Sequence, residues 1–482
     1  MQLRHSLFYL LAHGIPALAA FFTLALYTRW LSPEAYGLYS TLLVMANSAN
    51  IILFNWVYVA LMRYWNTSEF QEDELTSLVC VVLVTGSVLI IGVATVYFLF
   101  TRDALIAATI AILMISNAIY MGYQRINSIS LQAERYLFIE LARVVFTTLL
   151  AVGLVLTGYS WYGILLAISL GFLLIPLVSP HFWQRFWHYP KSLNYRKLLK
   201  LLKYGWPLSL TFMLLELIHA TDRILLSWLV GFEAAGQYAV AFSLPFQLLI
   251  LVASAINMAA YPLILQALEQ QGEEAAKAKL ADYLLVLLGL LLPSYFGLIA
   301  VSHDFMPLLI GADYLGESLR LLPIIGFLLI INAIYLFYIS LAFQIAKQTH
   351  KTVWVVGLAA LLNLILNLIL IPFYQINGAI LASLISYLIC VIYGYRLSAN
   401  YFKMPILWLE LGKLVIAASL MLIALKNLPI GTGLLEGLIR ILIGVILYLA
   451  MIWLLNISKV RLVLDDFLKT VNKRNESTHY QS

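Results

Sequence analysis

The chain has 482 residues, of which 63% are hydrophobic and only 11% are charged, against roughly a quarter charged in ordinary soluble domains. It cannot cover a water-facing surface of normal size, so lipid must be its main solvent. The formal net charge of +6 is explained by basic residues that fix membrane orientation, and it indicates no nucleic-acid partner.

Apolar runs of roughly 20 residues, each long enough to cross a bilayer, recur along the chain. They are too long for barrel strands, and hydrocarbon tolerates no unpaired backbone, so we predict an all-α polytopic membrane protein with about 14 transmembrane helices. The first run has no small-residue cleavage site and is interpreted as a retained helix. The predicted spans are Leu7–Tyr27, Leu38–Met62, Leu78–Phe100, Ala104–Tyr123, Leu137–Thr157, Trp161–Val178, Tyr204–Trp228, Tyr238–Leu268, Tyr283–Val301, Leu321–Phe343, Val353–Pro372, Ala379–Leu397, Leu407–Leu425 and Leu438–Leu455.

The distribution of Lys and Arg predicts the orientation of these spans. With the N-terminus in the cytoplasm, most of the 29 Lys and Arg residues fall on the inner side, as basic loops favour. Both termini are therefore expected to be cytoplasmic. Cys80 and Cys390, the only cysteines, lie within apolar runs and suggest neither a disulfide framework nor a metal site.

The sequence repeats two motifs in the same order. Glu34–Tyr39 and Glu233–Tyr238 both read EAxGxY, and Tyr159–Ala167 and Tyr374–Ala382 both read YxxxGxxLA. Six spans separate the members of each pair, and six is even, so the halves are expected to be parallel repeats with a cleft between them. The predicted domains are an N-terminal six-helix lobe at 1–190, a C-terminal six-helix lobe at 191–403, two additional helices at 404–456 and a cytoplasmic tail at 457–482.

The longest predicted cytoplasmic connection, His181–Lys203, joins the two lobes. It carries six basic residues and no acidic residue. Two interpretations remain open: a purely topogenic loop, or a segment that attracts anionic lipid head groups.

The sequence contains no P-loop, HExxH, GxSxG or CxxC pattern. No loop between spans is long enough to house a soluble catalytic domain. We therefore expect no enzyme activity and no cofactor, and ion-coupled or uncoupled movement of a solute is favoured over an ATP-driven pump.

Ionisable groups within spans are costly, so each is a functional candidate. In the seventh span, Ser209, Glu216, His219 and Arg223 fall on one helix face and Asp222 lies beside it. Arg223 is a candidate for binding an anionic group, and Glu216, His219 or Asp222 for carrying a coupling ion. The alternative is a buried polar seam in which the carboxylates neutralise Arg223 and hold helices together.

The fifth span places Glu140, Arg143 and Thr147 on one face. Arg143 is interpreted either as a snorkelling side chain or as a phosphate ligand, because a guanidinium offers paired donors to phosphate oxygens. Arg125, after the fourth span, is interpreted as a boundary anchor or a further cavity residue. Asn363 and Asn367, four residues apart in the eleventh span, favour interhelical hydrogen bonding, with substrate contact as the alternative.

Three stretches resemble the polysaccharide-transporter branch of the multidrug, oligosaccharidyl-lipid and polysaccharide flippase superfamily, often called O-antigen flippases. They are LSPEAYGLYS at Leu31–Ser40, TDRILLSWLVGFEAAGQYAVAFSL at Thr221–Leu244 and LLNLILNLILIPFYQINGAILASLISY at Leu361–Tyr387. The resemblance covers approximately Leu7–Asn400. It implies two six-helix bundles that rock around a central cavity in a bacterial inner membrane.

The cargo that the resemblance implies is an undecaprenyl-pyrophosphate-linked oligosaccharide, carried from the cytoplasmic to the outer face. Family members often use cationic cavity residues for the pyrophosphate, and Arg143 and Arg223 are the nearest candidates here, with Arg125 as a third. Protons or sodium ions, and other polysaccharide-assembly proteins, are further expected partners. Two rivals stay open: a multidrug or cation antiporter of the same superfamily, and a membrane-embedded polysaccharide polymerase or acyltransferase.

Overall fold

The computed structural model describes residues 19–457 apart from 66, 68, 131, 180–182 and 184–193, and every regular element among them is helical. Most of the predicted first span, Leu7–Tyr27, lies outside the described residues, and so does nearly all of the predicted tail at 457–482. Most of the connection before residue 194 also lies outside them. The helix that continues from the first predicted span is described from residue 19 to residue 30.

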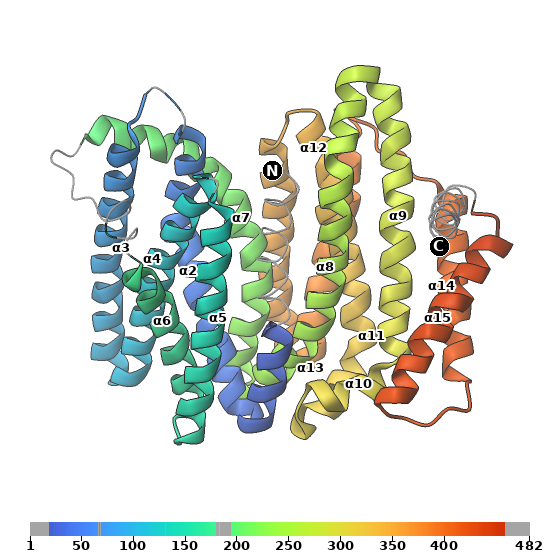
Figure 1. The fold of residues 1–482 in the computed structure, drawn as a ribbon, viewed down its shortest axis with the longest axis horizontal. Helices are drawn as coiled ribbons and strands as arrows, with labels where there is room; N and C mark the ends of the chain where they lie inside the picture. Colours follow the sequence, from blue (N-terminus) through green and yellow to red (C-terminus); the bar gives the residue numbers. More distant parts are fainter. Residues whose placement is uncertain are drawn as a thin grey trace, which may run out of the picture. The chain divides into compact units, whose positions relative to one another are not determined.

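The described helices confirm the predicted all-α polytopic membrane fold (Figure 1). Among the described residues, twelve helical segments are long and apolar enough to cross a membrane. One of them contains two of the predicted spans, and another runs through a short π-helix, η2. The helices are α2 (Pro33–Tyr64), α3 (Glu72–Thr101), α4 (Ala104–Ile129), α5 (Ala133–Leu156), α6 (Trp161–Val178), α7 (Tyr195–Leu229), α8 (Phe232–Gln271), α9 (Glu273–Ala300), α10 (Ser302–Leu309), α11 (Ala312–Ile334), η2 (Tyr335–Ile339), α12 (Ser340–Ile345), α13 (His350–Ser398), α14 (Trp408–Lys426) and α15 (Leu434–Leu454).

Helix α13 is two spans joined by a sharp kink. Gln375 has φ 50° and ψ −125°, which is not a helical conformation, and it follows Pro372, which cannot continue the hydrogen-bond ladder. The chain turns back so closely that a Cβ on Gly378 would lie 2.4 Å from the carbonyl oxygen of Leu370. Glycine at this turn therefore lets the predicted eleventh and twelfth spans form a hairpin.

The two copies of the EAxGxY motif contact each other reciprocally. A Cβ on Gly37 would lie 1.7 Å from the carbonyl oxygen of Phe232, and a Cβ on Gly236 would lie 2.0 Å from that of Pro33. Pro33 and Phe232 occupy equivalent positions in the two copies. Each glycine thus contacts the residue that precedes the motif in the other copy. Such reciprocal contacts are typical of two copies related by a two-fold axis. This geometry is the one expected of parallel repeats.

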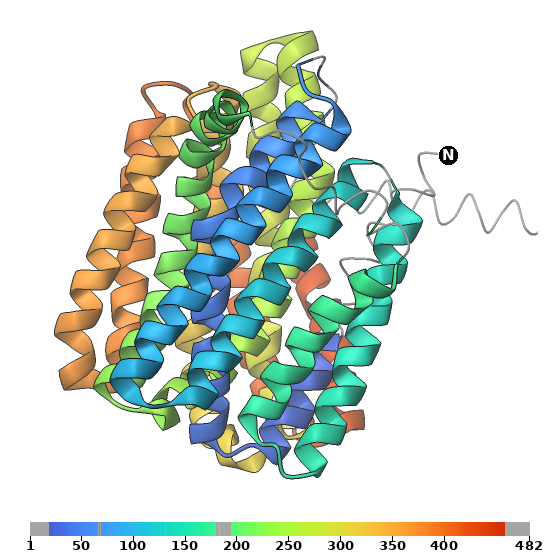
Figure 2. The same cartoon turned by 90° about the vertical axis from the view of Figure 1, so that its left-hand side faces the viewer.

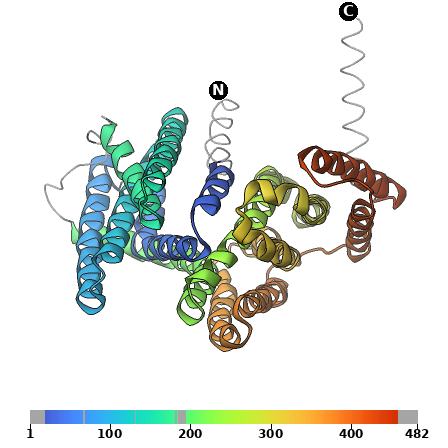
Figure 3. The same cartoon turned by 90° about the horizontal axis from the view of Figure 1, so that it is seen from below.

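The helices form two compact units. Unit 1 comprises residues 1–240, 309–314 and 353–386, and unit 2 comprises 241–308, 315–352 and 387–482. Within unit 1, α2 packs against α3, α4, α6 and α7 (Figure 2). Within unit 2, α14 packs against α9 and α15 (Figure 3). The bounds of these units differ from those of the predicted six-helix lobes. The two lobes remain a prediction.

Candidate functional site

The polar stripe of α7 faces α2 within unit 1. Asn55 of α2 donates a hydrogen bond from Nδ2 to Ser209 Oγ at 3.3 Å. Glu216, His219 and Arg223 are half-buried, and Arg223 lies within electrostatic range of both other side chains and of Tyr39 on α2. The residues of the predicted stripe therefore lie close together in the structure. Helix α2, which has polar side chains of its own, packs over them.

Asp222 points to the other side of α7, into a cluster supplied by three further helical segments. Its Oδ2 accepts hydrogen bonds from Tyr238 Oη at 2.7 Å and Ser383 Oγ at 2.6 Å. Its Oδ1 accepts from Asn367 Nδ2 at 2.8 Å and Asn363 Nδ2 at 3.4 Å. We call these five residues the Asp222 cluster. Asp222 is only 2% exposed, and its partners are as deeply buried.

Among the described residues, no cation contacts the carboxylate of the Asp222 cluster. All interactions of Asp222 in the described part of the chain are with hydroxyl and amide groups. Burying a charge without a counter-charge is expensive even when hydrogen bonds satisfy its oxygens. A carboxylate in this setting favours binding a proton or a cation.

The ligand chemistry of the Asp222 cluster suits a hard cation as well as a proton. Such cations take carboxylate, amide carbonyl and hydroxyl oxygens, and Asn363, Asn367, Ser383 and Tyr238 supply these groups around the carboxylate. Oδ1 of Asn367 is buried and accepts no hydrogen bond within the described residues, and a turn of the amide would bring an oxygen toward Asp222. No group of three or more His, Cys, Asp or Glu side chains is placed to hold a metal in that part of the chain.

The sequence singled out Asp222, Asn363 and Asn367 separately but did not bring them together, and it did not single out Tyr238 or Ser383. Tyr238 ends the second EAxGxY motif, and Asn363, Asn367 and Ser383 come from the two arms of α13. The spacing of the two asparagines by four residues showed that they share a helix face. Nothing in the sequence showed that this face meets Asp222, more than 140 positions earlier.

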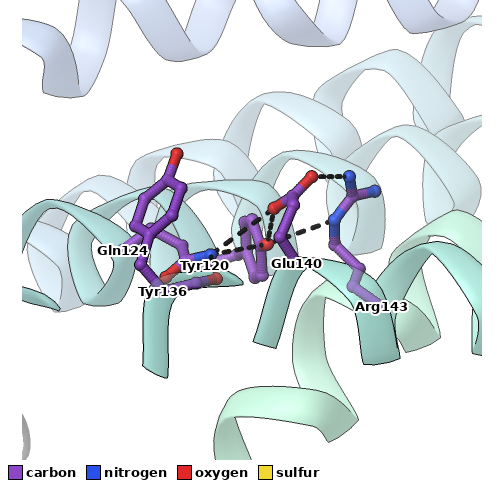
Figure 4. A network of polar contacts seen from close by, with 5 residues as sticks. All are labelled: Tyr120, Gln124, Tyr136, Glu140 and Arg143. Atoms are coloured by element: carbon purple, nitrogen blue, oxygen red, sulfur yellow. Dashed lines mark hydrogen bonds and ion pairs between the residues drawn. The ribbon is translucent and has the colours of Figure 1, made fainter. Parts of the chain in front are cut away.

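Arg143 lies in a separate network, shown in Figure 4. Its guanidinium forms an ion pair with Glu140, one turn earlier on α5, and donates from Nε to Tyr120 Oη at 3.2 Å. Tyr120 donates to the Glu140 carboxylate, and Gln124 donates to Tyr120 Oη at 3.0 Å. The guanidinium carbon lies 5.3 Å from the ring centres of both Tyr120 and Phe172.

The neighbours of Arg143 determine whether its guanidinium is available to a ligand. Its side chain is 17% exposed and that of Glu140 is 10% exposed, so the two charges largely compensate each other in a poorly hydrated place. Aromatic rings fix the guanidinium through cation–π contacts. A phosphate would have to replace Glu140 as the partner of Arg143 in this conformation.

The three predicted arginines do not share one site in this structure. The side-chain contacts of Arg143 are with α4, α5 and α6, whereas Arg223 faces α2. Arg125 is exposed near the end of α4, close to Tyr58, and belongs to neither network. Of the three, Arg223 is the one that directly follows Asp222 along α7.

Unit 2 contains an apolar cavity of ≈ 560 Å³ between α9 and the helix pair α14 and α15. Three glycines, Gly289, Gly297 and Gly444, help to open it, and Arg440 lies on its wall. Arg440 donates to both carboxylate oxygens of Asp304, at 2.6 and 2.5 Å. The cavity is therefore lined by hydrocarbon, with its one cation already paired.

Residues 26–319 match the sequence model of a family described as polysaccharide biosynthesis protein. No curated protein matches the sequence significantly. Among solved structures, the chain is similar to one described as the lipid II flippase MurJ in an inward closed conformation, with 16% identity and a TM-score of 0.72 over 93% of this chain and 98% of that one. It is also similar to an inward-facing multidrug resistance MATE family transporter of the MOP superfamily, with 15% identity and a TM-score of 0.56 over 87% of this chain and 99% of that one. These likenesses show the fold.

Proposed function

This chain belongs to the polysaccharide biosynthesis protein family, within the MOP flippase superfamily, and from that premise we propose that it flips a lipid-linked oligosaccharide across its membrane. The cargo in this proposal is an undecaprenyl-pyrophosphate-linked oligosaccharide for surface polysaccharide, such as O-antigen. It moves from the cytoplasmic to the outer face of a bacterial inner membrane. A sugar chain with a pyrophosphate cannot cross hydrocarbon unaided, because desolvating its charges and hydroxyls costs far more than thermal energy supplies.

One observation carries the proposal: two neighbouring residues of α7 point to different polar environments. Asp222 occupies a buried cluster of oxygen and amide groups without a cation, and Arg223 lies on the stripe with Glu216 and His219. Ion binding at Asp222 would act on the same turn of helix that presents a guanidinium to an anionic head group. This arrangement supports alternating access driven by protons or sodium ions.

The apolar cavity beside α14 and α15 is suited to the lipid part of the cargo. Its volume of ≈ 560 Å³ lies within the usual range of ligand pockets, and its walls offer almost only hydrocarbon. We assign it the prenyl chain, which remains in an apolar medium while the head group moves. The two helices that have no counterpart in the first half would then serve the tail of the cargo.

The proposal is tested by purified protein in vesicles that contain a short lipid-linked oligosaccharide. We expect a sugar-modifying enzyme outside the vesicles to reach all labelled cargo when the protein is present, and about half without it. Robust export of cationic dyes in a drug-sensitised strain, with no effect on lipid-linked sugar, would favour the antiporter instead. Polymer synthesis by the purified chain would favour the enzyme.

A further inference from the structure

Helix α7 is longer than a membrane span, and its first turns are too polar to lie within one. The helix has 35 residues, about 52 Å at 1.5 Å per residue, whereas a hydrocarbon core is only about 30 Å thick. It begins at Tyr195, before the predicted span that starts at Tyr204. Figure 1 shows these turns lying across one end of the unit 1 helices, at a steep angle to the rest of α7, and Figure 2 shows them end-on.

The bend has a local cause in the sequence. Pro207 lies inside α7 and removes a backbone hydrogen bond, which permits a kink. Two residues earlier, Gly205 lets α7 approach α2 so closely that a Cβ would lie 2.0 Å from the carbonyl oxygen of Trp56. The segment before the bend therefore runs along the end of the bundle.

Two parallel stripes run along this segment. The apolar stripe comprises Tyr195, Leu199, Leu202 and Trp206, at offsets of four, seven and eleven, and three of its members are exposed: Tyr195 by 64%, Leu202 by 36% and Trp206 by 44%. The basic stripe comprises Arg196, Lys200 and Lys203, at offsets of four and seven. Helical periodicity places the two stripes side by side on one surface.

Some basic side chains of this segment form ion pairs with other parts of unit 1, and others are exposed. Lys200 pairs with Glu69 at 2.5 Å, and the neighbouring Lys197 pairs with Glu74 at 2.5 Å. Arg196 and Lys203 are exposed, and no ion pair of theirs is found within the described residues. The acidic partners thus hold the helix in place while two cations next to the apolar stripe face outward.

We propose that this segment of α7 is an interfacial anchor that binds anionic phospholipid head groups of the cytoplasmic leaflet through Arg196 and Lys203. An exposed apolar stripe beside a basic one is the pattern of a helix that lies in the plane of a membrane surface, and basic side chains at that level attract anionic lipids. Because the same helix carries Asp222 and Arg223, the anchor fixes the depth of the candidate site in the membrane. The assignment does not depend on which cargo the protein carries.

The test compares lipids that carry the same photoactivatable acyl chain on different head groups. The full chain is reconstituted in phosphatidylcholine vesicles doped with either photoactivatable phosphatidylglycerol or photoactivatable phosphatidylcholine, and labelled peptides are identified by mass spectrometry. We expect labelling of residues 195–206 to favour phosphatidylglycerol. The double variant Arg196→Gln/Lys203→Gln should lower that preference roughly thirty-fold, since each basic side chain near an anionic surface contributes a factor of about five.

The matched control is Lys279→Gln/Lys403→Gln, which removes the same charge from two other exposed positions. It should leave the preference unchanged, and raised salt should weaken the preference of the native chain. Equal labelling by the two lipids, an unchanged preference in the Arg196→Gln/Lys203→Gln variant, or an equal loss in the control would overturn the proposal. Displacement of phosphatidylglycerol by inorganic phosphate at buffer concentrations would also overturn it, because the ligand would then be free phosphate.

Discussion

Asp222 and Asp304 are both buried carboxylates, and their partners predict opposite results when each is changed to asparagine. Asp222 is surrounded by neutral donors, whereas Asp304 is paired with Arg440. In Asp222→Asn, one carboxylate oxygen becomes an NH₂ group facing two former donors. An unsatisfied polar group costs about 1–3 kcal/mol, but the hydroxyl groups of Tyr238 and Ser383 can turn to accept from the new NH₂. We expect a stability loss of about 1–2 kcal/mol.

Transport should respond far more strongly than stability to Asp222→Asn. If the carboxylate carries one coupling charge, its loss removes about 2.3 kcal/mol of driving force per 100 mV of membrane potential. That is roughly a fifty-fold change in the steady-state distribution of cargo. We expect surface glycan to be nearly lost while the amount of protein in the membrane stays close to that of the native chain.

In Asp304→Asn, the Arg440 guanidinium stays buried without an anion. Its side chain is 10% exposed and that of Asp304 is fully buried, and breaking such a pair costs about 3–5 kcal/mol. Thermal melting in detergent should therefore fall steeply for Asp304→Asn and little for Asp222→Asn, while the glycan assay separates the two in the other direction. Normal glycan in Asp222→Asn, or equal destabilisation of both variants, would refute the reasoning.

Other predictions test the close helix contacts, the arginine network and the coupling ion. Gly37→Ala and Gly236→Ala should each destabilise the protein by about 1–3 kcal/mol through overpacking, whereas Gly92→Ala, with no atom within 4 Å of its added Cβ, should not; equal melting of all three would contradict the contact. Arg143→Ala should lower membrane abundance by leaving Glu140 without a cation, and adding Glu140→Ala should restore it; glycan that stays absent in the restored double variant would show that Arg143 binds cargo. Vesicle transport should fall when the gradient of the coupling ion is collapsed, and transport indifferent to both proton and sodium gradients would remove Asp222 from the mechanism.

The membrane fold could be predicted from the sequence because lipid imposes a simple rule on the chain. A span must be long, apolar and helical, so the runs gave nearly all helices, including the two arms of α13. Helical periodicity likewise placed Glu216, His219 and Arg223 on one face, and the structure keeps them together. The repeated EAxGxY motif indicated a duplication, and the reciprocal contacts of Gly37 and Gly236 agree with it.

Which faces meet was decided only by tertiary structure. Periodicity fixes the direction of a side chain around its own helix, but it carries no information about the neighbouring helix. Glu140 therefore pairs with Arg143 one turn away, on the face of α5 where periodicity placed both, whereas the donors to Asp222 come from residues as far as 161 positions away. The sequence by itself determined that the chain crosses a membrane many times and that charged side chains lie within its fifth and seventh spans. Only the packing of α7 against α2, α8 and α13 decided which of those charges has a counter-charge and which does not.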